Sequence, residues 1–425
     1  MRSWIFAVLL MCQVAAVTAA QRDHALDQVA DAYLTLALQL THYDKNPFVF
    51  IGDKSRLAAA KSEVPSLAEL ETQLAGQLAV LRALTHGDAG RRASLDARLL
   101  ATLTRAQILQ GKYPASFDDE TRLMFGVVVP SRSETHFSAL IAELDQLIPG
   151  DAPLHERMER FRDQFVIPVE KLSLVMNTAL QECRRRTKAN IAMPADEALQ
   201  LVIVQDKPFV GFTQFMGDSR SQILINRDVP VHIERAIELG CHEAYPGHHT
   251  HGSLLEANIS MSRGWAEFDY FPLYGPFAIV MEGVANFGID VAFPADEREK
   301  YERDVLLPMA GISDNDYATY QHYLRLQREL NFARNEAARM YLYGGASREE
   351  AIEWLMRFGL ETRGTASQRL DFIAAYRTYV ICYNFGLDVV EQFVQRTAQN
   401  DTWDTLENIL NGNITPEMML QTIQQ

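Results

Sequence analysis

A proline-glycine pair interrupts a cluster of ionisable side chains in the segment His242-Glu243-Ala244-Tyr245-Pro246-Gly247-His248-His249. Pro246 has no backbone N–H and disfavours the α conformation at the residue before it, while Gly247 permits unusual backbone angles. In a straight helix the two later histidines would lie about 9 and 10.5 Å along the axis from His242, at about 1.5 Å per residue. The pair therefore predicts a break in the helix, which could swing one of the later histidines back towards His242.

Three imidazoles and a carboxylate within one short segment indicate a metal site. Zinc is held by histidine nitrogen and carboxylate oxygen, and catalytic zinc keeps one position open for water. We predict His242 and one of the next two histidines as ligands. The spacing leaves His248 and His249 open; we favour His248 and expect His249 behind it or facing substrate. Glu243 is the predicted general base. The alternative is an ordinary helix C-terminus, where Gly, Pro and His are common.

A second helix is predicted over Met281–Asp290, downstream of the cluster. It carries Glu282, which we predict as the third metal ligand. Asn286 and Asp290 follow at helical spacing on the same face, and we expect them to orient the ligands through hydrogen bonds. A glutamate near a helix start is otherwise usually a surface residue that favours the helix dipole.

The octapeptide, followed by Glu282-Gly283, resembles the DUF885 family of metallopeptidases, which carries an H-E-x-x-P-G-H-H string and a later E-G-x-A segment. The resemblance also takes in Ile223–Asn226 and Tyr383–Gly386, and so covers roughly residues 200–390. The family is similar to helical zinc carboxypeptidases and oligopeptidases of the gluzincin type. The resemblance therefore implies a mainly α fold around a peptide cleft, one zinc ion and a peptide substrate.

Two departures from the family pattern concern the expected substrate-binding wall. Val284 stands where many relatives have an aromatic residue, and Arg377 and Tyr379 stand where they have Pro and Gln. Metallopeptidases stabilise the developing oxyanion with a donor beside the metal; we predict Tyr383 for this catalytic role and Tyr379 as the second candidate. Arg377 could clamp a substrate carboxylate, giving carboxypeptidase behaviour, or form a structural ion pair. These differences leave the substrate preference open.

The first twenty residues predict a secretory signal peptide, because Arg2 precedes an apolar run and small residues end at Ala20. The expectation is an exported protein, periplasmic or secreted. Lipid attachment at Cys12 is disfavoured because Met11 is a poor residue before a lipoprotein cysteine. No later stretch has the length and apolar character of a membrane span.

The mature chain retains three cysteines, Cys183, Cys241 and Cys382. This number is too small for a disulfide framework and allows one disulfide at most. Cys241 adjoins His242, but neighbouring helical residues point about 100° apart. We therefore expect Cys241 to be a buried structural thiol rather than a metal ligand.

Residues 21–195 and 196–425 are predicted as a helical N-terminal region and a catalytic region within one continuous domain. A net charge of −15 argues against nucleic acid as a partner. β-branched segments predict a small sheet or hairpin over Leu201–Val204 and Ser221–Asn226, beside the active-site helix over Val231–Tyr245. Periodicity predicts helices at Val29–Leu40, Leu67–Leu84, Ala93–Gln110, Phe137–Leu147, His155–Arg186, Tyr317–Tyr343, Ser347–Phe358, Ser367–Thr397 and Thr402–Leu410.

Together these features predict an exported, zinc-dependent peptidase with a mainly α fold. The alternative is a degenerate relative that binds metal or peptide without hydrolysis. Neither the cleaved peptide, nor the end from which it is cut, nor the oligomeric state follows from the sequence.

Overall fold

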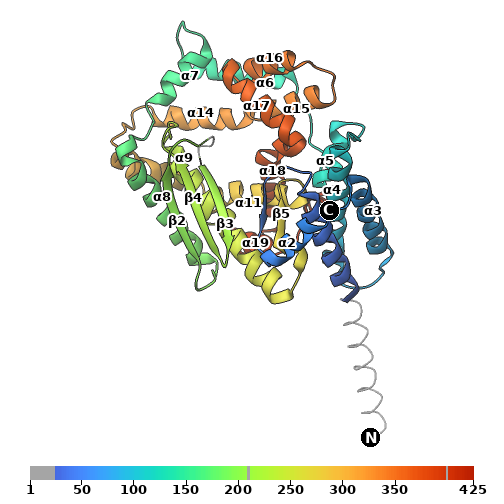
Figure 1. Ribbon diagram of the computed structural model, residues 1–425. Coiled ribbons are helices and arrows are strands. Elements are labelled where there is room, and N and C mark those ends of the chain that lie inside the picture. The colour runs from blue at the N-terminus through green and yellow to red at the C-terminus, as the bar shows by residue number, and fades with distance from the viewer. Residues whose placement is uncertain (1–23, 208–210, 399–400) are drawn as a thin grey trace, which may run out of the picture.

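The computed structural model describes residues 24–207, 211–398 and 401–425 (Figure 1). The predicted signal peptide and Cys12 lie outside these residues. The predicted mainly α fold is confirmed. The helices are residues 24–40, α2 (Lys54–Ser62), α3 (Leu67–Ala83), α4 (Ala89–Leu109), α5 (Phe117–Phe125), α6 (Glu134–Leu147), α7 (Leu154–Asp163), α8 (Val169–Asn190), α9 (Glu234–Leu239), η1 (Gly240–Ala244), α10 (His248–Leu255), η2 (Glu256–Met261), η3 (Ala266–Asp269), α11 (Pro276–Ala292), α12 (Glu297–Tyr301), η4 (Glu302–Leu306), α13 (Leu307–Ala310), α14 (Tyr317–Leu330), α15 (Ala333–Leu342), α16 (Arg348–Phe358), α17 (Arg363–Tyr376), η5 (Arg377–Tyr383), α18 (Phe385–Thr397), α19 (Thr402–Leu410) and α20 (Pro416–Gln424).

The prediction of a single helix over His155–Arg186 is wrong, because the chain forms two helices there, α7 and α8, with an extended segment between them. Pro168 stands at the N-cap of α8 and cannot continue α7. The extended segment pairs with the chain before α9, where the N–H of Ile167 donates to Val231 O at 2.9 Å. The break thus ties α8 to the segment that leads into the histidine cluster.

Two predicted C-terminal helices are also interrupted. The stretch Tyr317–Tyr343 divides into α14 and α15. The stretch Ser367–Thr397 is broken because α17 ends at Tyr376, and the next residue, Arg377, has a φ of 53°, which lies in the left-handed region. The tight helix η5 follows before the chain enters α18. The interruption places Tyr379 and Tyr383 on a short element of their own rather than along a regular α-helix.

The predicted strand region forms a small sheet with order β2-β4-β3. β2 (Ala198–Val204) runs parallel to β4 (Arg220–Asn226), and β3 (Gly211–Gly217) runs antiparallel to it. Figure 1 shows this sheet on one side of the molecule with α8, and α3 and α4 on the opposite side. A separate antiparallel pair joins β1 (Phe48–Phe50) to β5 (Tyr270–Pro272).

One cluster of buried hydrophobic side chains runs from Leu26 to Met419 and so draws on both halves of the chain. Phe268 and Phe277 belong to a smaller buried cluster and pack against the guanidinium of Arg98, at 4.5 and 4.1 Å from their ring centres. These two aromatic residues between the histidine cluster and α11 therefore pack in the interior. Within the described ranges, no single helix has both the length and the apolar character of a membrane span. Two helices joined at a bend, 276–292 and 297–310, together have the length and composition of one, with no other evidence of a span.

Candidate metal centre

The predicted break at Pro246-Gly247 is present. The π-helix η1 ends at Ala244, the peptide bond before Pro246 is cis, and α10 begins at His248. The N–H of Gly247 donates to Cys241 O at 2.9 Å, and a Cβ atom on this glycine would lie 1.8 Å from His242 O. No other residue fits this approach, so the turn needs glycine for space.

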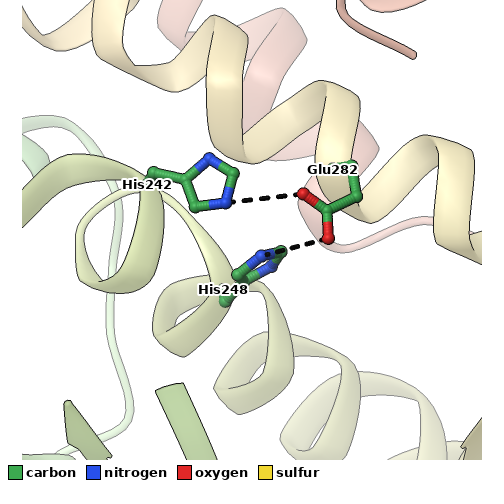
Figure 2. A group of neighbouring side chains, drawn as sticks. All are labelled: His242, His248 and Glu282. Atoms are coloured by element: carbon green, nitrogen blue, oxygen red, sulfur yellow. Dashed lines mark ion pairs between the residues drawn. The ribbon is translucent and has the colours of Figure 1, made fainter. Parts of the chain in front are cut away.

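The turn brings the rings of His242 and His248 together, with their centres 4.7 Å apart, and places both beside Glu282 of α11 (Figure 2). The Nε2 atom of His242 lies 3.4 Å from Glu282 Oε2, and Nε2 of His248 lies 3.8 Å from Oε1. One ligand atom from each of the three residues lies within 4.8 Å of the others. A Cβ atom on Gly288 would lie 2.7 Å from Pro246, so α11 packs directly on the turn.

Hydrogen bonds fix which nitrogen of His242 faces the group. The Nδ2 of Asn286 donates to Tyr383 O at 3.3 Å, which turns its amide oxygen towards His242 Nδ1 at 3.0 Å. An amide oxygen only accepts, so Nδ1 carries the hydrogen and Nε2 presents a lone pair. Burial, followed by the nearby charge of His248, lowers the pKa of His242 and favours this neutral form. Asn286 thus lies where the sequence predicted it.

The donor atoms of this group fit a divalent ion. Oε2 of Glu282 is buried and has no hydrogen-bond donor among the described residues, although it faces the lone pair of His242. Two facing lone pairs repel unless a cation lies between them. Zinc bonds of about 2.0–2.1 Å at a tetrahedral angle would separate two ligand atoms by about 3.3 Å, close to the 3.4 Å observed.

Three further predicted residues surround the group. The hydroxyl of Tyr379 donates to Glu282 Oε1 at 3.1 Å, and the ring of Tyr383 packs edge-on against Tyr379 with ring centres 5.4 Å apart. Tyr383 is 46% exposed. Its pKa is raised by burial and then by the carboxylate of Glu282. Glu243 directly follows His242, and its backbone oxygen accepts a hydrogen bond from the hydroxyl of Thr213 at 3.2 Å.

His249 does not belong to the group of ligand atoms. It is fully buried, its Nδ1 lies 2.8 Å from Ser221 Oγ, and its Nε2 lies 3.0 Å from Glu197 Oε2. The same carboxylate oxygen accepts a hydrogen bond from the hydroxyl of Tyr245 at 2.6 Å. The prediction that His249 is an alternative ligand or faces substrate is therefore wrong. Instead, the His249 ring joins the turn to β4 and to Glu197.

Glu197 was missed by the sequence analysis. Its side chain is fully buried, and it also pairs with Arg184 at 2.7 Å and Lys188 at 2.6 Å. Burial would raise the pKa of this carboxyl, but hydrogen bonds from His249, Lys188, Tyr245 and Arg184 hold it well below its ordinary value. We call Glu197, Tyr245, His249 and Ser221 the turn clamp.

Two other predicted residues, Arg377 and Asp290, lie away from the ligand group. Arg377 forms a bidentate ion pair with buried Glu120, with Nη2 2.7 Å from Oε2, so the structural ion pair, one of its two predicted roles, is present, and the substrate clamp is corrected. Asp290 is exposed and its nearest basic partner, Arg328, lies 3.9 Å away. It extends from the solvent side of α11 and makes no hydrogen bond to the ligand group among the described contacts.

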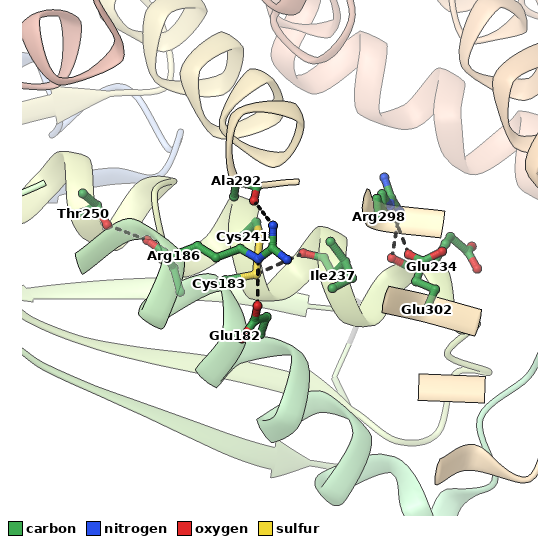
Figure 3. The surroundings of a disulfide bond; sticks show 11 residues. Glu182, Cys183, Arg186, Glu234, Ile237, Cys241, Thr250, Ala292, Arg298 and Glu302 are labelled. Carbon is green, nitrogen blue, oxygen red and sulfur yellow. Dashed lines mark hydrogen bonds and ion pairs between the residues drawn. A yellow bond between two sulfur atoms is a disulfide. The ribbon is translucent and has the colours of Figure 1, made fainter. Parts of the chain in front are cut away.

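A disulfide joins Cys183 of α8 to Cys241 of η1 (Figure 3). The expectation that Cys241 is a free thiol was wrong, whereas the limit of one disulfide holds: Cys382 is buried and free. The thiol prediction failed because α8 and η1 pack side by side, bringing the two Cα atoms to 5.4 Å. The bond fixes η1 immediately before His242.

No family model matches this chain, and no curated protein matches it. Among solved structures, the chain is similar to that of a "putative lipoprotein from Colwellia psychrerythraea", with a TM-score of 0.52 and 15% sequence identity. The similarity covers 86% of this chain and 71% of the other. It shows a shared fold, while membership of DUF885 stays a prediction from the motif.

Proposed function

We propose that this chain is an exported, zinc-dependent peptidase that hydrolyses peptide bonds. One observation carries the proposal: the lone pair of His242 Nε2 faces the unpartnered, buried Oε2 of Glu282 at 3.4 Å, with His248 completing the group. When bound, zinc would polarise a carbonyl and lower the pKa of water. The set of two histidines and one glutamate matches the ligand set of thermolysin-type zinc sites.

Glu243 is the proposed general base. It directly follows His242, and a glutamate carboxylate is ionised at neutral pH, so it can accept a proton from the attacking water. Tyr383 is the proposed donor to the oxyanion of the tetrahedral intermediate. Its raised pKa keeps the phenol protonated, so that the hydroxyl can donate. Tyr379 would hold Glu282 in place through its hydrogen bond to Oε1.

The position of β3 supports a peptide as the substrate. β3 is an edge strand, paired only with β4 within the described sheet. Thr213 of this strand donates from its hydroxyl to Glu243 O at 3.2 Å, which places the edge beside the proposed base. An edge strand can bind an extended peptide through main-chain hydrogen bonds. The proposed substrate is therefore an extended peptide held along β3.

Export is supported by the sequence of the first twenty residues and by the disulfide between Cys183 and Cys241. Disulfides form and persist in oxidising compartments such as the bacterial periplasm or the extracellular space. A reduced cytosol would not maintain this bond. The disulfide and the N-terminal sequence therefore both support the proposal that the protein is exported.

The test combines metal content with hydrolysis of a peptide library. The wild type should bind one zinc ion, and His242→Ala should lose it because one of the three ligands is gone. Glu243→Gln should keep the zinc yet lower hydrolysis by about 10²–10⁴-fold, the usual contribution of a general base. His322→Ala removes a surface histidine that pairs with Glu143 at 2.8 Å and serves as the control.

Two results would contradict the proposal. Full hydrolysis by Glu243→Gln would remove Glu243 from the role of base. Equal zinc content in the wild type and in His242→Ala would show that the metal binds elsewhere. Zinc binding without hydrolysis of any peptide would instead favour the alternative of a non-hydrolytic metal-binding protein.

A further inference from the structure

A pocket of about 130 Å³ lies between α15, α17 and η5. Its lining includes Arg334, Arg369, Phe372, Ile373, Val380 and Tyr383. Tyr383 is shared with the candidate metal centre, since its ring packs against Tyr379, which donates a hydrogen bond to Glu282 Oε1 at 3.1 Å. The pocket therefore adjoins the proposed catalytic group, across one tyrosine.

The charge of this pocket is positive. Arg334 donates from Nε to Glu361 Oε1 at 3.0 Å, and Nε of Arg369 lies 3.7 Å from the same oxygen. In the described part of the chain, Glu361 is the one carboxylate paired with either guanidinium. Two arginines thus share a single acid, which leaves an excess of one positive charge at the pocket.

This excess charge is poorly compensated. Burial, and then the charge of Arg369, lower the pKa of Arg334 to about 10 in spite of Glu361. Arg334 therefore remains charged at neutral pH but lies in a positive potential. A bound anion would relieve the repulsion between the two guanidiniums, and guanidinium groups suit carboxylates because they donate two parallel hydrogen bonds.

We propose that this pocket binds a carboxylate of the peptide ligand beside the metal centre, with Arg369 as the main contact. The proposal rests on the proposed function for the nature of the ligand. Arg369 is 45% exposed and lies 3.7 Å from Glu361, whereas Arg334 lies at 3.0 Å from the same carboxylate. Phe372, Ile373 and Val380 give the pocket an apolar wall for the carbon atoms next to the carboxylate. This carboxylate can come from the C-terminus of the peptide or from an acidic side chain.

The experiment measures equilibrium binding to the full-length, zinc-loaded protein carrying Glu243→Gln, in which the proposed hydrolysis is removed. One pair of probes is acetyl-Ala-Ala-Phe as the free acid and as the amide. The other is acetyl-Ala-Glu-amide and acetyl-Ala-Gln-amide. We expect one charged probe to bind at least about tenfold more tightly than its neutral partner, the effect of one charge-assisted hydrogen bond.

Arg369→Gln should abolish this preference, while Arg369→Lys should retain part of it because the charge stays. Arg357→Gln is the matched control, since Arg357 is also exposed and makes a long ion pair of 3.5 Å, with Glu134. A preference in the first pair identifies a C-terminal carboxylate, and one in the second pair an acidic side chain. Equal binding within both pairs, or a preference that survives Arg369→Gln, overturns the proposal. Because the readout is binding, a failure of hydrolysis in the wild type would refute the peptidase but leave this result interpretable.

Discussion

Replacing Glu197 by Gln tests whether the turn clamp holds His248 in place. The side chain of Glu197 is fully buried and accepts hydrogen bonds from Tyr245 at 2.6 Å and His249 at 3.0 Å. A hydrogen bond to a charged group contributes about 1.5–3 kcal/mol, so the two bonds contribute about 3–6 kcal/mol in total. The amide of Gln keeps the volume and can accept one of them.

The ion pairs with Arg184 and Lys188 add little to this value, because their side chains are 37% and 39% exposed. Exposed pairs contribute at most about 1 kcal/mol each. We therefore expect Glu197→Gln to lower the free energy of unfolding by about 2–4 kcal/mol. Zinc affinity should fall about 10–100-fold, as for other residues that hold a ligand in position. Urea denaturation and a zinc competition assay measure the two quantities.

The pH dependence gives a second readout of the same carboxylate. Hydrogen bonds and ion pairs hold the pKa of Glu197 below that of the unfolded chain, in spite of burial. A group with a lowered pKa contributes stability that is complete above its unfolded pKa, about 4.3, and is lost as the pH falls below it. The wild type should therefore lose stability below about pH 4, and Glu197→Gln should lack this part of the loss.

The control is Asp96→Asn, which breaks an exposed ion pair with Arg82 of 2.6 Å. It should change the free energy of unfolding by less than about 1 kcal/mol and leave zinc affinity unchanged. The reasoning is refuted if Glu197→Gln behaves like this control in both assays. A loss of stability with unchanged zinc affinity would separate the two effects and show that the clamp does not position His248.

Two further perturbations act on other supports of the site. Asn286→Ala removes the acceptor for His242 Nδ1 and should weaken zinc binding about 10–100-fold, measured by competition with a chelator; an unchanged affinity would mean that the hydrogen bond of 3.0 Å does not orient the ring. The double variant Cys183→Ser and Cys241→Ser opens a loop with a sequence separation of 58 residues. In the chain-entropy account this lowers the free energy of unfolding by about 4 kcal/mol, and a denaturation midpoint equal to that of the wild type would contradict it.

The sequence predicted the parts of the fold that depend on local signals. Hydrophobic periodicity predicted α3, α4, α6, α16 and α19, and β-branched residues predicted β2 and β4, whereas α2, α5, α10, α12, α13 and α20 were not predicted. The errors lie where tertiary contacts interrupt a periodic segment, as at Pro168, where the chain pairs with Val231, and at Arg377, where an ion pair with Glu120 accompanies a left-handed backbone. The contacts with Val231 and Glu120 join residues far apart in the chain and leave no local pattern, whereas Pro168 is itself a local helix-breaking signal that the prediction overlooked.

The same distinction applies to the candidate site. The break at Pro246-Gly247 and the helical spacing of Glu282 and Asn286 are local, and the structure brings these residues together with His242. For Arg377 the sequence left a substrate clamp and a structural ion pair open, because the partner that decides between them, Glu120, lies in another helix. The prediction for Asp290 is wrong because this residue lies two helical turns after Glu282, beyond the ligand group, where its side chain is exposed.

The choice between His248 and His249 shows why a motif alone could not decide the ligand set. Adjacent residues on a helix point about 100° apart, so only one of the two can face Glu282. The Pro-Gly break permits either choice. Glu197, 52 residues away from His249, binds that ring on the far side of the turn and leaves His248 to face Glu282 in the candidate metal centre. The octapeptide therefore combines two functions, with His242, Glu243 and His248 directed to the proposed chemistry and Tyr245 and His249 directed to the clamp.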